Sequence, residues 1–167
     1  MTRRVLFVCL GNICRSPLAK WVFIDQARGR GVLERFEVDS CGLGGWHEGE
    51  GADPRTIAVA TRHRVAFEHM ARQIRVPRDF ERFDLLLAMD RENVRGLRGL
   101  GAPMERVRLL RSFDPALAGA DEHALEVPDP YYGGPEGFER MHAMIVAACA
   151  GLLDHLVGGG GGATRPR

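Results

Sequence analysis

The sequence predicts an α/β fold, a three-layer sandwich with a central four-stranded parallel sheet and a phosphate-binding loop after the first strand. Residues 5–9 and 83–89 are nearly continuous apolar runs, which is typical of strands buried on both faces of a parallel sheet. Segments with helical signals follow both runs. Strands that alternate with helices imply a parallel sheet that is covered on both sides.

The first strand, at 5–9, leads through a short loop into the first helix. We expect this helix to begin at Ser16 and Pro17, because serine can cap free N–H groups and proline is favoured at the first helical position. Gly29 and Gly31 are expected to end it.

The rest of the chain continues the alternation of strands and helices. Asp90 is expected to cap the helix that follows the strand at 83–89. The last helix starts at Pro135 and carries an apolar stripe. Between the first and the last helix we expect a strand at 36–40, a glycine-rich loop at 41–53 and a helix at 54–64. The helix that Asp90 caps is expected to end near residue 100, and a strand at 107–110 and a polar loop at 112–134 follow it.

Length and composition indicate one soluble domain. The chain has 167 residues, and we expect a single domain at 1–157 followed by a flexible glycine-rich tail at 158–167. The net charge is +1, from 23 basic and 22 acidic residues, so bulk charge does not indicate nucleic-acid binding. No apolar run approaches the roughly 18 residues of a membrane-spanning helix. The sequence shows no signal peptide, so we expect a cytoplasmic protein, although secretion without such a signal remains open.

Four cysteines in a reducing compartment are expected to be free or catalytic rather than paired in structural disulfides. Cys9 and Cys14 form a lone pair without the two further ligands that a structural zinc site needs, so no metal is expected. Nothing in the sequence suggests an organic cofactor.

The loop at 9–17 carries the chemistry that the sequence indicates. Gly11 and Asn12 tolerate a positive φ, which lets successive N–H groups turn inward and form a nest for an anion. The following helix terminus also favours an anion, and Arg15 can add a planar fork of donors. The same positive field stabilises a thiolate at Cys9. The simpler interpretation is a buried structural cysteine beside an arginine that forms a surface ion pair.

Two separated motifs resemble the low-molecular-weight protein tyrosine phosphatases. The first is VCLGNICRSP, which contains Cys9 and Arg15, and the second is DPYYGG, which begins at Asp129. The resemblance covers about residues 4–157. It implies that Cys9 attacks phosphorus and forms a phosphocysteine, that Arg15 binds the transition state, and that Asp129 acts as general acid and then general base. The phosphate-binding loop would comprise Leu10, Gly11, Asn12, Ile13, Cys14 and Ser16 together with Arg15.

The resemblance also implies roles around this loop. Ser40 and His69 would support it through hydrogen bonds with Asn12 and Ser16, although a lone serine or histidine is more often satisfied locally. Cys14 would form a reversible disulfide with Cys9 under oxidation, or else pack beneath the loop.

Aromatic side chains would form the walls of the substrate cleft. Trp46, Tyr131 and Tyr132 match positions near the mouth of the family's site, where they would make the cleft deep enough for phosphotyrosine and too deep for phosphoserine. The simpler interpretation of Trp46 is a loop anchor. Cys41 replaces the alanine usual in the family, and we interpret it as a packing substitution rather than a second redox partner.

Three rival functions follow from related loops. A protein-arginine phosphatase on the same scaffold would carry threonine where this chain has Ile13. A thioredoxin-coupled arsenate reductase would need two further neighbouring cysteines, whereas Cys41 and Cys149 are far apart in the sequence. A phosphotyrosine-binding module would not need Cys9 and Asp129. We therefore expect phosphotyrosine-bearing proteins as partners, with a cognate tyrosine kinase as one candidate, and a monomer or weak dimer.

Overall fold

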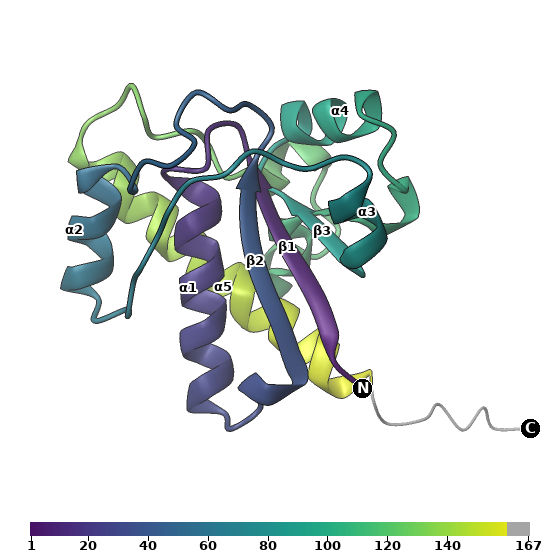
Figure 1. The fold of residues 1–167 in the computed structure, drawn as a ribbon. Coiled ribbons are helices and arrows are strands. Elements are labelled where there is room, and N and C mark those ends of the chain that lie inside the picture. The colour runs from purple at the N-terminus through teal and green to yellow at the C-terminus, as the bar shows by residue number, and fades with distance from the viewer. Residues whose placement is uncertain (160–167) are drawn as a thin grey trace, which may run out of the picture.

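The computed structural model describes residues 1–159 and places a four-stranded parallel sheet at the centre of the molecule (Figure 1). The strand order is β2-β1-β3-β4. The predicted α/β architecture is therefore confirmed. The strands are β1 (Arg3–Cys9), β2 (Phe36–Gly42), β3 (Leu85–Ala88) and β4 (Val107–Leu109), and the helices are α1 (Arg15–Gly29), α2 (Pro54–Arg62), α3 (Arg78–Arg82), α4 (Arg91–Gly99) and α5 (Pro135–Gly158).

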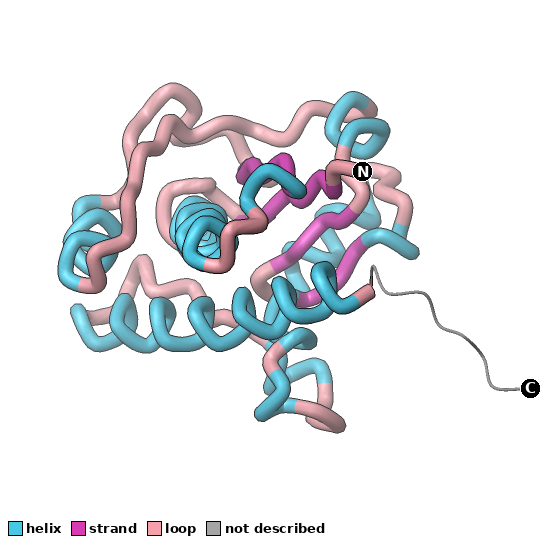
Figure 2. Tube along the Cα trace, turned by 90° about the horizontal axis from the view of Figure 1, so that it is seen from below, coloured by secondary structure: helices cyan, strands magenta, loops and turns pink. Residues whose placement is uncertain are grey.

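Side chains of β1 alternate between two separate cores, one on each face of the sheet. Val5, Phe7 and Cys9 belong to the core formed with α1, α2 and α5. Leu6 and Val8 belong to the core formed with α3 and α4. This alternation is the two-residue period of a strand, and it produces the expected three layers, which are visible when the sheet is seen from below (Figure 2).

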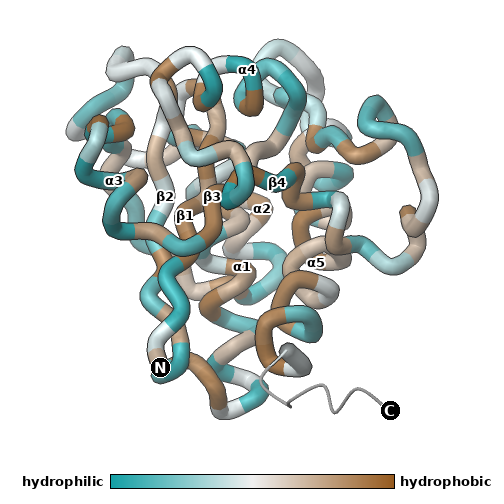
Figure 3. Tube along the Cα trace, turned by 90° about the vertical axis from the view of Figure 1, so that its right-hand side faces the viewer, coloured by the Kyte–Doolittle hydropathy of each residue, from teal (hydrophilic) through white to brown (hydrophobic). Residues whose placement is uncertain are grey.

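Helix α5 closes one face of the sheet and packs along α1. By length and composition alone, this helix could also cross a membrane, but the core helix of a soluble protein can have the same length and composition. In this fold its apolar side is buried against the sheet layer, where brown segments gather along β1, β3 and α5 (Figure 3). Its fully buried residues are Phe138, Met141, Ile145, Ala148, Cys149, Leu152 and Leu153.

The carboxyl end of β1 is the topological switch point of the sheet. From β1 the chain passes through α1 to β2 on one side, and then crosses over to β3 on the other side of β1. Open α/β sheets bind their ligands at this point. Cys9 is the last residue of β1 and lies in register with Gly42 of β2.

Several predicted strand and helix boundaries were wrong by a few residues. The second strand continues beyond 36–40 to Gly42, because parallel pairing with β1 runs to its end. The third strand covers only Leu85–Ala88, because its parallel pairing with β1 spans only these four residues. The fourth ends at Leu109, where a turn of 3-10 helix begins. Helix α3, five residues long, was not predicted.

The prediction that Ser16 caps the first helix was also wrong. Helix α1 begins at Arg15, and its N-cap residue Cys14 makes no side-chain cap hydrogen bond. The Ser16 hydroxyl instead lies within hydrogen-bond distance of Cys9 and Asn12. Asp90 does cap α4, as predicted, in a capping box with Asn93.

The first residue of the expected tail belongs to the last helix. Gly158 is the last residue of α5, and Gly159 follows it in a turn. Residues 160–167 of the expected tail lie outside the described part of the chain. The assignment of 1–157 to one domain stays a prediction.

Candidate active site

The loop between β1 and α1 curls back over the end of β2. Asn12 adopts the left-handed conformation that the sequence predicted, with φ 58°, whereas Gly11 does not have a positive φ. The backbone nitrogen of Asn12 lies 3.3 Å from the Cys9 sulfur. The backbone of the loop passes so close to Gly42 that a Cβ there would lie 2.9 Å from the carbonyl oxygen of Leu10. A side chain at position 42 would therefore push the loop away. No local sequence pattern indicated this role for Gly42.

Asn12 is the centre of the hydrogen-bond network that holds the loop. Its side chain is fully buried, and its Nδ2 donates to Ser16 Oγ (2.8 Å) and Ser40 Oγ (3.0 Å). Its Oδ1 accepts the backbone N–H of Arg72 at 3.0 Å. The structure thus brings together the residues predicted to support the loop, and adds Arg72, which the sequence analysis missed.

His69 holds the loop through a hydrogen bond to its backbone. Its Nε2 lies 2.6 Å from the carbonyl oxygen of Asn12, and because a carbonyl can only accept, Nε2 carries the proton. Burial lowers the pKa of His69 and outweighs the opposing effect of this hydrogen bond. The ring is therefore neutral at neutral pH and holds the loop as a hydrogen-bond donor rather than as a cation.

The Cys9 sulfur lies at the bottom of the site with two polar neighbours. The side chain is 3% exposed, and Sγ is 3.0 Å from the hydroxyl of Ser16 and 3.3 Å from the N–H of Asn12. Because Ser16 Oγ accepts from Asn12, its own proton is free to point to Cys9 or to the carbonyl of Cys41. Donors of this kind stabilise a thiolate.

Arg15 is buried, and its guanidinium group lies close to three oxygen atoms of other segments. Its Nη1 donates to Asp90 Oδ2 (2.6 Å) and to the carbonyl of Val127 (3.0 Å), and its Nη2 lies 3.5 Å from Asp129 Oδ2. Burial alone would lower the pKa of Arg15, but Cys9 and the two carboxylates raise it above its ordinary value. Arg15 therefore remains a cation inside the site. Asp90, predicted only as a helix cap, also positions this guanidinium.

Asp129 faces the same space from the loop before α5. One carboxylate oxygen accepts the N–H of Tyr131 at 3.1 Å, and the other faces Arg15. The side chain is 38% exposed, so solvent reaches it. Its carboxylate lines the same cavity as Cys9.

Cys9, Arg15 and Asp129 share one cavity of about 310 Å³. Trp46 and Tyr132 stand largely exposed at this cavity. The complete set of lining residues is Cys9, Leu10, Gly11, Ile13, Cys14, Arg15, Trp46, His47, Asp129, Tyr131 and Tyr132. Most residues predicted for the site therefore line this cavity, but Asn12 and Ser16 of the predicted phosphate-binding loop do not, and His47 was missed.

Arg55 connects the Asp129 loop to the phosphate-binding loop, and the sequence analysis missed it. Its Nη2 donates to the carbonyl of Tyr131 (3.0 Å) and also pairs with the Asp53 carboxylate (2.8 Å). Asp53 in turn donates its backbone N–H to the carbonyl of Ile13 at 2.9 Å. Both walls of the cavity are therefore attached to the start of α2. Only the helix-start pattern Asp-Pro-Arg marks Arg55 in the sequence.

The remaining cysteines occupy different environments. Cys14 lies in the same core as Cys9, where burial and the Asp53 carboxylate raise its pKa to about 12. Cys41 is fully buried in the opposite core, as a packing substitution requires. Cys149 is buried under α1, and burial raises its pKa. All four cysteines are free.

Comparison with known proteins gives one consistent result. Residues 4–158 match the model of the low molecular weight phosphotyrosine protein phosphatase family. A low molecular weight protein-tyrosine-phosphatase of Streptomyces coelicolor is 55% identical over 157 residues, covering 92% of this chain and 93% of that protein.

Solved structures agree with the sequence matches. A protein tyrosine phosphatase of Entamoeba histolytica superposes with a TM-score of 0.86 at 34% identity, covering 95% of this chain and 99% of that one. A Drosophila arginine phosphatase superposes with a TM-score of 0.81 at 30% identity, covering 91% of this chain and 96% of that one. The chain belongs to the low molecular weight phosphotyrosine protein phosphatase family.

Proposed function

We propose that this protein hydrolyses phosphotyrosine in proteins through a phosphocysteine intermediate at Cys9. The observation that carries the proposal is the convergence of Cys9, Arg15 and Asp129 on one cavity, with the Cys9 thiol at its base. Phosphoryl transfer needs positioning and charge stabilisation above all. The loop N–H groups and the Arg15 guanidinium are the groups that would supply both.

The first step transfers the phosphoryl group to the enzyme. The Cys9 thiolate attacks phosphorus, a P–S bond forms, and the bond between phosphorus and the tyrosine oxygen breaks. Asp129 gives its proton to the departing phenolate. Arg15 and the loop amides bind the equatorial oxygens while charge builds up on them.

The second step releases phosphate. Water attacks the phosphocysteine, and Asp129, now a carboxylate, takes a proton from that water. The P–S bond breaks, inorganic phosphate leaves, and Cys9 returns to the thiolate. Ser16, whose hydroxyl lies 3.0 Å from Cys9 Sγ, stabilises this leaving thiolate.

The aromatic rim favours phosphotyrosine. Tyr131 and Tyr132 stand edge to face with ring centroids 5.0 Å apart, and Trp46 lines the same cavity. Flat walls of this kind would hold a phenyl ring while its phosphate reaches Cys9. Phosphotyrosine-bearing proteins, a cognate tyrosine kinase among them, are the substrates that we propose.

A protein-arginine phosphatase is the second candidate function, because one structural neighbour carries that name. Ile13 lines the cavity of this chain, where the arginine-selective branch would carry a threonine that can help select the guanidino group. The arsenate reductase is less well supported. Cys41 and Cys149 are buried on opposite faces of the sheet, so neither is placed to pass a disulfide onward.

Phosphate release from matched phosphotyrosine and phosphoarginine peptides decides between the two phosphatase functions. The assay is run side by side in EDTA and reductant, with Cys9→Ser as control. We expect fast, Cys9-dependent release from phosphotyrosine only. Preference for phosphoarginine would show that Ile13 does not determine specificity, and no release from either peptide would contradict the proposed activity.

We propose that oxidation of Cys9 is reversible through a disulfide with Cys14. Peroxide converts the Cys9 thiolate to a sulfenic acid, and the Cys14 sulfur displaces hydroxide, which leaves as water after protonation. The raised pKa of Cys14, about 12, makes this second step slow near neutral pH and faster as the pH rises. After hydrogen peroxide treatment, we expect activity to return with dithiothreitol and mass spectrometry to find the Cys9–Cys14 bond. Irreversible loss without that bond would contradict the switch.

The four free cysteines are consistent with a reducing compartment, and we place the protein in the cytoplasm on this ground. We also propose that it acts as a monomer or weak dimer, because each chain contains a complete cavity.

A further inference from the structure

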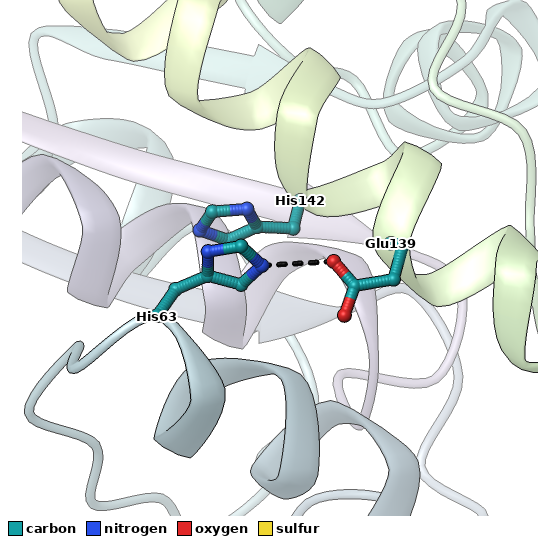
Figure 4. Close-up of side chains that lie close together, drawn as sticks. All are labelled: His63, Glu139 and His142. Atoms are coloured by element: carbon teal, nitrogen blue, oxygen red, sulfur yellow. Dashed lines mark hydrogen bonds and ion pairs between the residues drawn. The ribbon is translucent and has the colours of Figure 1, made fainter.

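A second cluster of ionisable side chains lies where the end of α2 meets α5, away from the cavity of Cys9. His63 follows the last residue of α2, and Glu139 and His142 stand one helical turn apart on α5 (Figure 4). His63 Nε2 lies 2.8 Å from Glu139 Oε2. The two imidazole rings are stacked, with centroids 3.8 Å apart and planes 14° from parallel.

These three side chains offer a donor set that suits a transition metal. One atom from each, two imidazole nitrogens and a carboxylate oxygen, lie within 4.8 Å of one another. Bonds of 2.0–2.1 Å in tetrahedral geometry place two ligand atoms about 3.4 Å apart. Two histidines with one glutamate is a known ligand set for Zn²⁺. To share one ion, the two rings would have to turn out of their parallel stack so that their nitrogen lone pairs converge.

We propose that His63, Glu139 and His142 form a binding site for Zn²⁺, with the fourth position open to water. No active-site residue belongs to this cluster, so the inference stands independently of the proposed function. The site would tie the end of α2 to α5. Since the start of α2 holds both walls of the cavity through Asp53 and Arg55, the ion would clamp this helix at its other end.

The side chain of His63 is 40% exposed, so its ring has room to turn away from the stacked arrangement and toward a shared ion.

Arg62 competes for the same carboxylate, which provides a sharp test. Its Nε donates to Glu139 Oε1 at 2.7 Å, and its positive charge opposes a cation bound nearby. Removing Arg62 should therefore tighten Zn²⁺ binding. If the cluster were only a surface ion pair with stacked rings, removing Arg62 would have no such effect.

The experiment is a calorimetric titration of Zn²⁺ into the full chain, after removal of metals with a chelator. We expect one Zn²⁺ per chain. His63→Gln and Glu139→Gln should each weaken the affinity at least ~100-fold, since even residues that only support metal ligands cost 10–100-fold. Arg62→Gln should strengthen it several-fold. His155→Gln, an exposed histidine on the same helix, is the matched control and should leave the affinity unchanged.

Co²⁺ in place of Zn²⁺ identifies the donor atoms by absorption spectroscopy. A tetrahedral spectrum without a thiolate charge-transfer band is expected, and it should be lost in His63→Gln and unchanged in Cys9→Ser. The proposal is overturned if no Zn²⁺ binds, if His63→Gln binds as tightly as the wild type, or if the only spectrum observed carries a thiolate band that Cys9→Ser removes.

Discussion

Cys9→Ser is expected to abolish turnover while the protein still binds inorganic phosphate. A serine hydroxyl is a far weaker acid than a thiol and a weaker nucleophile at neutral pH, so serine at this position cannot replace the attacking sulfur. Loss of the nucleophile in an enzyme that works through a covalent intermediate costs ~10⁴-fold or more in kcat. The measurement is kcat for a phosphotyrosine peptide, together with a calorimetric titration of phosphate.

Phosphate binding separates loss of chemistry from loss of structure. The loop N–H groups and Arg15 remain in the variant, so its affinity for phosphate should stay close to that of the wild type. Cys149→Ala is the cysteine control, because Cys149 is buried under α1 and does not line the cavity, and it should keep the wild-type kcat. Substantial residual turnover in Cys9→Ser would exclude Cys9 as the nucleophile.

Asp129→Asn should slow hydrolysis of phosphotyrosine by ~10²–10⁴-fold, the range for loss of a general acid. Asparagine keeps the side-chain oxygen that accepts the Tyr131 N–H, so the loop should keep its conformation. An amide cannot protonate the phenolate as it leaves. The measurement is kcat/KM across a series of aryl phosphates whose leaving groups differ in acidity.

The dependence on the leaving group distinguishes an acid from a structural residue. A good leaving group departs without a proton, so the loss in kcat/KM should shrink steadily as the phenol becomes more acidic. A purely structural role, or loss of the ion pair with Arg15, would slow all substrates alike. Equal losses across the series would therefore argue against Asp129 as the general acid.

Contiguous residues made the loop predictable from the sequence. Cys9, Gly11, Asn12 and Arg15 lie at the junction between a buried strand and a helix, so their spacing alone brings them together in one tight loop. The left-handed conformation of Asn12 was predicted in the same way, from the few residue types that tolerate it. Local geometry determined this part of the site.

The missed residues depend on partners that are distant in the sequence. Arg72 meets Asn12 across 60 positions, and Arg55 meets Tyr131 across 76. Asp90 meets Arg15 across 75 positions, and only its local role as a helix cap could be predicted. The wrong prediction for Ser16 has a different cause, because its hydroxyl is taken up within the loop itself, by Cys9 and Asn12. A local sequence pattern does not indicate contacts between residues that lie this far apart in the chain.

The most direct test of the proposed mechanism is to locate the phosphoryl group on the enzyme during turnover. Enzyme and phosphotyrosine peptide are mixed, quenched within the first turnovers, digested and analysed by mass spectrometry. We expect the phosphoryl group on the sulfur of Cys9, and more of it in Asp129→Asn with a substrate whose leaving group needs no proton, because the attacking water then lacks its base. A phosphoryl group on another residue, or turnover with none bound to the enzyme, would contradict the mechanism.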